Sequence, residues 1–219
     1  MKREIITIII CWLSFWALPA HAALVTIQIT AEIDDVYDPY GYLGGKIKVG
    51  DTITGRYIYD SSTPDQDWLR GGGVSSPTVG RYHYFNPPYG ISLTAGGFVF
   101  QTDPAGVNFL VGIVNDNDSG DDIYYIDSYN NLPLSNGVTV GNISWYLNDP
   151  TGHVFSNDAL PISAPILDDW GLNFLSAGGG GGRATVFAFA GHVTAAELVP
   201  EPGTILLLTV GSLLLRKRK

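Results

Sequence analysis

The densest group of potential ligand atoms in this chain is the acidic run Asn115-Asp116-Asn117-Asp118-Ser119-Gly120-Asp121-Asp122. Carboxylate and amide oxygens crowded on one loop are the hard ligands that calcium prefers. We therefore take Asp116, Asp118, Asp121 and Asp122 as candidate calcium ligands. The spacing departs from an EF-hand, because Gly120 stands at the fifth position and no closing glutamate follows. The alternative is an Asx-rich turn whose side chains accept hydrogen bonds from nearby backbone amides.

Catalytic chemistry has little support in the main body of the chain, residues 23–198. The only cysteine, Cys11, precedes this body, which excludes disulfides, thiolate zinc sites and cysteine nucleophiles from it. No spacing singles out an acid–base pair of carboxylates, and no G-x-S-x-G motif is present. The body's histidines have no metal-type spacing; they are His83, His153 and His192. We expect no enzyme and no catalytic residue, and we keep a polysaccharide hydrolase or lyase only as a less favoured alternative.

One tryptophan is a candidate for contact with a sugar. Trp68 lies in the polar segment 64–70, where an indole ring has little reason to be buried. Aromatic rings on β-rich scaffolds can stack on sugar rings, so the sequence offers a carbohydrate-binding module as a second function, with calcium at the acidic loop as a candidate stabilising ion. By contrast, Trp145 alternates with Ile143 and Leu147, a spacing typical of a core position on a strand.

The elements that must position these residues are strands. Residues 23–34 alternate apolar and polar side chains with a period of two over ten residues, as a half-buried strand does. Further strands are expected at 52–60, 80–86, 91–95, 98–102, 107–115, 122–128, 138–148 and 183–197, separated by turns rich in Gly, Pro, Asn and Asp. Ala95-Gly96-Gly97 predicts a tight hairpin, and residues 178–182, all glycine, predict a flexible loop.

No stretch of the body has a convincing helical period, so the sequence predicts an all-β fold. Short strands at regular spacing favour a jelly-roll-like, two-sheet antiparallel β-sandwich. We expect its first and last strands to be neighbours, because chain ends often lie close together. This domain would occupy residues 23–198, between an N-terminal signal helix and a short C-terminal transmembrane helix.

The charge of the body excludes one class of partner. Residues 23–199 carry nineteen acidic and six basic side chains, a net charge of −13. A surface of this sign repels nucleic acid and anionic lipid. We therefore expect no nucleic-acid partner. Separately, we expect no cofactor beyond the calcium ion considered above.

The N-terminus has the three parts of a secretory signal peptide, over residues 1–22. Basic residues at positions 2 and 3 precede an apolar stretch at 5–18, and Pro19-Ala20-His21-Ala22 supplies a small-residue cleavage site. We expect signal peptidase to cut between Ala22 and Ala23, so the secretion machinery would be a partner.

The C-terminus, residues 199–219, is also built in three parts. Val199-Pro200-Glu201-Pro202 precedes the apolar residues 203–215, and Arg216-Lys217-Arg218-Lys219 ends the chain. Thirteen residues of helix span roughly 20 Å, short of the ~30 Å hydrocarbon core, but the terminal cations can extend to the headgroups. Cationic flanks stay cytoplasmic, which would place the body outside. A plain membrane anchor is the alternative interpretation.

This tail resembles the PEP-CTERM sorting signal, which has the same motif, apolar span and basic end in the same order. The resemblance implies processing by exosortase, a membrane-embedded, cysteine transpeptidase-like enzyme of Gram-negative bacteria. Pro200, Glu201 and Pro202 would then be the residues recognised and cut. Segments 54–65 and 147–152 also resemble parts of other exported proteins with this signal, which implies a shared domain of uncharacterised activity.

These features together predict a non-catalytic, exported protein. We expect a precursor held in the inner membrane by its C-terminal helix, then cut and released to the cell surface or the extracellular matrix. The resemblance implies an association with exopolysaccharide and biofilm, so extracellular polysaccharide is an expected partner.

Overall fold

The computed structural model describes residues 24–66, 78–180 and 185–200. Its regular structure is ten strands and a 3₁₀ turn, η2, at Leu167–Asp169. The strands are β1 (Leu24–Tyr37), β2 (Thr52–Asp60), β3 (Val79–Tyr84), β4 (Gly90–Ala95), β5 (Phe98–Gln101), β6 (Phe109–Val114), β7 (Asp122–Ser128), β8 (Val140–Asp149), β9 (Leu172–Gly179) and β10 (Phe187–Leu198). The predicted all-β fold is therefore confirmed for the described part of the chain.

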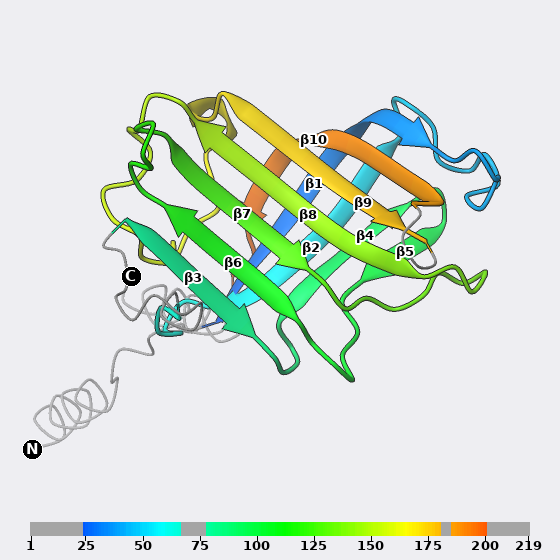
Figure 1. Ribbon diagram of the computed structural model, residues 1–219, viewed down its shortest axis with the longest axis horizontal. Coiled ribbons are helices and arrows are strands. Elements are labelled where there is room, and N and C mark those ends of the chain that lie inside the picture. Colours follow the sequence, from blue (N-terminus) through cyan, green and yellow to red (C-terminus); the bar gives the residue numbers. More distant parts are fainter. Residues whose placement is uncertain (1–23, 67–77, 181–184, 201–219) are drawn as a thin grey trace, which may run out of the picture.

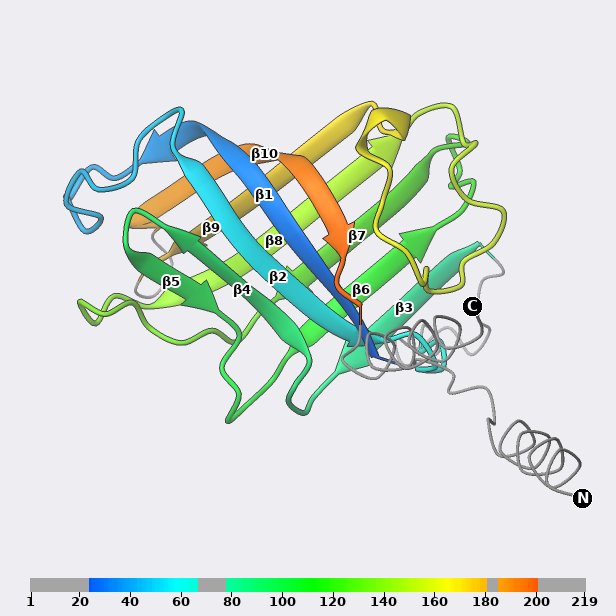
Figure 2. The same cartoon turned by 180° about the vertical axis from the view of Figure 1, so that it is seen from behind.

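All ten strands belong to one antiparallel sheet in the order β3-β6-β7-β8-β9-β10-β1-β2-β4-β5. The sequence predicted two separate sheets, and this division is wrong, because strand pairing runs unbroken from β3 to β5. The sheet curls instead, so that β6, β7 and β8 lie in front of β1, β2 and β4 in Figure 1 and behind them in Figure 2.

Two β-bulges in the pair β1–β10 contribute to the curl. The register of this pair shifts twice, between Thr30 and Ala31 and between Ile33 and Asp35. Each shift leaves one residue without a partner, and such a β-bulge bends the strand and increases its twist. The expectation that the first and last strands are neighbours is confirmed by this pairing.

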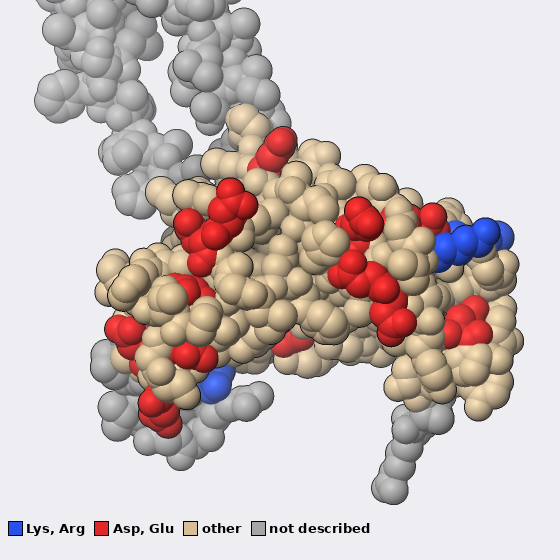
Figure 3. All heavy atoms as spheres, turned by 90° about the horizontal axis from the view of Figure 1, so that it is seen from above, with Lys and Arg blue, Asp and Glu red and all other residues tan. Residues whose placement is uncertain are grey.

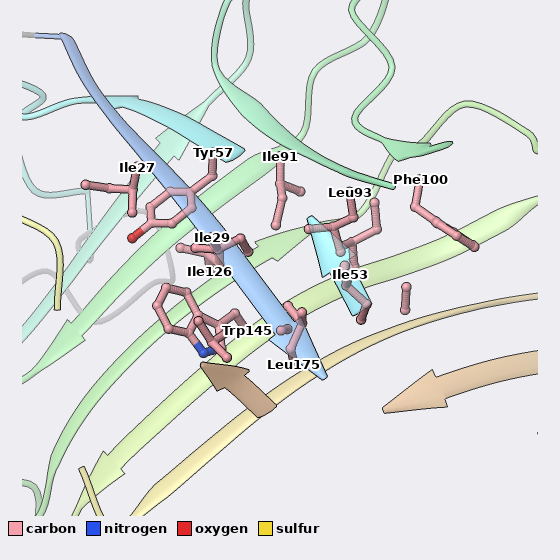
Figure 4. Packing of buried hydrophobic residues seen from close by; sticks show 14 of the residues in the cluster. Ile27, Ile29, Ile53, Tyr57, Ile91, Leu93, Phe100, Ile126, Trp145 and Leu175 are labelled. Atoms are coloured by element: carbon pink, nitrogen blue, oxygen red, sulfur yellow. The ribbon is translucent and has the colours of Figure 1, made fainter. Parts of the chain in front are cut away.

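The core fills the space between the two halves of the curled sheet. Tyr57 on β2 meets Trp145 on β8 edge to face, with ring centroids 5.9 Å apart. Phe100 on β5 meets Phe189 on β10 at 5.0 Å. Figure 4 shows side chains from both halves pointing toward one another. The alternation read from the sequence is confirmed here, because Val25, Ile27, Ile29, Ala31 and Ile33 are all buried, as is Trp145.

Two local predictions have different outcomes. Gly96 and Gly97, with φ of 56° and 81°, form the turn between β4 and β5, as the predicted tight hairpin requires. Strand β9 was missed, and the predicted loop at 178–182 starts too early, because Gly178 and Gly179 pair with both neighbouring strands. The inward positions of β9 end in Ala177, which has only a methyl group, and Gly179, which has no side chain, so the alternation signal is weak.

The predicted signal helix and C-terminal transmembrane helix lie outside the described residues. Within those residues, no helix has the length and apolar character needed to cross a membrane.

Candidate functional site

The acidic run forms the loop that leads into β7, and its best-buried carboxylate is committed to the backbone. Asp122 is fully buried. Its Oδ1 accepts a hydrogen bond from the Asp116 amide at 3.0 Å, and its Oδ2 accepts one from the Phe155 amide at 2.6 Å. Asp122 therefore ties its own loop to the segment that follows β8.

Elsewhere in the run, Asn117 follows the Asx-turn alternative. Asn117 Oδ1 accepts hydrogen bonds from the amides of Ser119 and Asp121. Asp121 Oδ2 accepts one from Asn148 Nδ2 at 3.2 Å, while Asp118 is exposed. Within the described ranges, no group of three or more His, Cys, Asp or Glu side chains is arranged to hold a metal ion. The calcium site at Asp116, Asp118, Asp121 and Asp122 stays a prediction, since these carboxylates are not gathered around one point in the described structure.

A second carboxylate accepts backbone hydrogen bonds at the same end of the sheet as Asp122. Asp149 on β8 stands opposite Asp122 in the strand register. It accepts hydrogen bonds from the Thr151 amide, the Thr151 hydroxyl and the His153 amide, at 2.7 to 2.9 Å. The hydrogen bonds from the His153 amide and from Thr151 lower the pKa of Asp149 to about 2. The sequence reading missed Asp149, although the Asp-Pro-Thr-Gly turn signal at 149–152 marks the position.

The three histidines lie on separate elements: His83 on β3, His153 in the segment after β8, and His192 on β10. His192 Nδ1 lies 2.9 Å from an Asp34 carboxylate oxygen, and about half of each side chain is exposed. The body's two glutamates, Glu32 and Glu197, lie on β1 and β10.

One hollow of about 260 Å³ lies beneath the segment that connects β8 to β9. It is lined by Tyr124, Val154, Phe155, Pro161, Ser163, Ala164, Pro165, Ile166, Asp169 and Trp170. Phe155 and Trp170 pack edge to face there, with centroids 5.5 Å apart. Trp170 Nε1 is buried and has no hydrogen-bond partner within the described part of the chain.

A second hollow, of about 280 Å³, lies beside β2, β4 and β5. It is lined by Arg56, Ile58, Pro87, Pro88, Tyr89, Gly90, Ile91, Ser92, Gln101, Thr102 and Pro104. Sequence reasoning passed over this site. The available signal was Arg56 itself, a lone cation in the middle of a predicted strand of a strongly acidic body.

Both chain ends leave the sheet at the same place. Ile27 near the start of β1 pairs with Leu198 at the end of β10, and the Val199 amide donates to the Thr26 carbonyl at 2.9 Å. Pro200 follows directly and is exposed. The other predicted recognition and cleavage residues, Glu201, Pro202, Ala22 and Ala23, lie outside the described residues, as does Trp68.

Comparison with known proteins gives no further guide, since no protein-family model, curated protein or solved structure matches this chain.

Proposed function

We propose that this chain is the precursor of a non-catalytic, exported β-protein that exosortase separates from its C-terminal helix. The released body joins the cell surface or the extracellular polysaccharide matrix. The observation that supports the proposal most directly is where the strands stop. Every described strand lies within 24–198, and Val199 makes the last backbone hydrogen bond of the sheet. A cut at Pro200–Pro202 would therefore remove the tail without breaking a strand pair.

The arrangement of the chain ends fits processing at both of them. The start of β1 and the end of β10 are paired, and in the sequence each directly adjoins a segment in which a cut is predicted. Pro200 is exposed, as an enzyme acting on this segment requires. The acidic surface in Figure 3 suits a protein that stays soluble after release.

The hollows support a binding or structural role over catalysis. A glycosidase needs two carboxylates about 5–10 Å apart across the bond that it cuts. The hollow under the β8–β9 connection has one carboxylate in its lining, Asp169, and the hollow beside β2 has none. Carbohydrate binding is the second candidate function, because the hollow beside β2 combines apolar walls with polar side chains.

Intact-mass analysis of the protein from its native host tests the main proposal. We expect a chain that begins at Ala23 and ends near Pro200–Pro202, together with any group attached during transfer. A strain without exosortase should retain the tail through Lys219. A mature protein that still carries Arg216–Lys219 in the exosortase-containing strain would rule the proposal out.

A further inference from the structure

On the outer face of the sheet, Arg56 lies in a row across the strands whose next members on both sides are uncharged polar side chains. The registers of β1, β2, β4 and β5 place Gln28, Arg56, Ser92 and Gln101 side by side. Their neighbours along the strands, Tyr57, Ile91 and Phe100 among them, point into the core. Alternation on a strand therefore puts Arg56, Ser92 and Gln101 together on the opposite face.

Arg56 has no acidic partner there. Its side chain makes no ion pair or hydrogen bond to any residue in the described ranges, although the body carries nineteen acidic side chains. The nearest acid in the row is Glu197, opposite Gln28 on β10 and so two strands away. At ~4.8 Å per strand this is about 10 Å, too far for a direct contact. In the described part of the chain, the Arg56 guanidinium is therefore a strong donor that no carboxylate of the body occupies.

The hollow beside Arg56 has the mixed lining that suits a sugar ring. Ile58, Tyr89 and the prolines at 87, 88 and 104 supply apolar walls, and Ser92, Gln101 and Thr102 supply hydrogen-bonding groups. None of its lining residues is acidic. Apolar surface with a few placed polar groups is typical of small-molecule sites, and a guanidinium is shaped to hold a carboxylate through two parallel hydrogen bonds.

We propose that this hollow binds a carboxylate-bearing sugar unit, with Arg56 paired to the carboxylate and Ser92 and Gln101 contacting ring hydroxyls. The proposal deepens the carbohydrate-binding candidate and rests on it. It does not rest on the sorting tail. If the chain is not processed by exosortase, this sugar-binding proposal is unaffected, and the absence of sugar binding would leave the processing proposal unaffected. An acidic sugar unit of a polysaccharide matrix fits the local positive charge of Arg56 and the lining of this hollow.

Titration of the full chain with galacturonate tests the proposal, using a detergent without a sugar headgroup and following heat or chemical shifts. We expect saturable binding, with galactose and acetate each bound at least tenfold more weakly, since each lacks half of the recognised chemistry. Arg56→Gln should weaken galacturonate binding by about tenfold or more, the usual scale for losing a charge-assisted hydrogen-bonded pair.

Lys48→Gln is the matched control. It removes the same charge from an exposed position in the β1–β2 connection, away from the hollow, and should leave the affinity within about twofold. An equal loss in both variants would mean that general charge, and not this site, attracts the ligand. Binding of galactose or acetate as tight as that of galacturonate would also overturn the proposal, and so would the absence of saturable binding. Circular dichroism of both variants shows whether the fold is retained.

Discussion

At the scale of single residues, Asp122 and Asp149 organise the end of the sheet at which the β6–β7 loop meets the segment after β8. Each carboxylate accepts hydrogen bonds from backbone amides that would otherwise lack a partner. A charged acceptor makes these bonds stronger than neutral ones, and this explains why two aspartates can be buried on adjacent strands. Among the oxygens that suggested a metal site in the sequence, those of Asn117 and Asp122 accept hydrogen bonds from backbone amides.

Asp149→Asn should destabilise the fold at neutral pH, because it replaces a charged acceptor of three hydrogen bonds with a neutral one. The pKa of Asp149 is lowered in the folded state, so its stabilisation is complete above the ordinary value near 3.8 and is lost as the pH falls toward about 2. Melting temperatures measured from pH 7 to pH 2 should therefore show a gap between wild type and variant that closes in acid.

The control for this series is Asp118→Asn, which makes the same charge change at an exposed position of the β6–β7 loop. It should shift the melting temperature little at any pH. A gap for Asp149→Asn that stays constant from pH 7 to pH 2 would contradict the assigned role of the carboxylate.

At the scale of elements, the pair β1–β10 has two of the register shifts that bend the sheet. Gly191 lies opposite Ile33, next to one of the two register shifts. A Cβ added at Gly191 would run into the Glu32 backbone carbonyl, which cannot move without separating the two strands. The close approach of these strands, and not a special backbone angle, requires glycine here.

Gly191→Ala should cost on the order of 1–3 kcal/mol in the free energy of unfolding, the usual range for overpacking. Gly141→Ala is the matched control, because its added Cβ would meet its nearest atom at 3.6 Å, an ordinary van der Waals distance. Urea denaturation of both variants measures the difference. Equal stability of the two variants would contradict this account, because it would mean that β1 and β10 can move apart to accept the extra methyl group without loss of stability.

At the scale of the whole molecule, buried tyrosines fasten the long β8–β9 connection and the end of β2. Tyr59 Oη donates to the Pro161 carbonyl, Tyr82 Oη to the Asp158 carbonyl, and Tyr84 Oη to the Asp60 carbonyl, at 2.7 to 2.9 Å. Tyr124 Oη donates to Tyr57 Oη across the core. Burial raises the pKa of all five phenols, and that of Tyr82 to about 12.

The fold should lose stability in alkali. A phenol with a raised pKa holds its proton more tightly in the folded state, so its contribution is present below pH 10 and falls as the pH rises through the folded value. Tyrosinate absorbance should rise together with the loss of circular dichroism above pH 10. Tyr82→Phe should be less stable than wild type at pH 7, by about 1 kcal/mol for one hydrogen bond, and the difference should shrink toward pH 12. A difference independent of pH would contradict this account.

The amino-acid sequence by itself determined which segments are strands and which face of each is buried, since alternation is a local property. The bounds of β2 and β7 match their predicted ranges, whereas β9 escaped because small inward residues carry little contrast. Only the tertiary structure decided which strands pair, that they form one curled sheet, and that Arg56, Ser92 and Gln101 share a row. Alternation encodes the face that a side chain takes but not its neighbour across the strands. That neighbour depends on the strand register and on β-bulges. Both are determined by contacts between residues that are far apart in the chain.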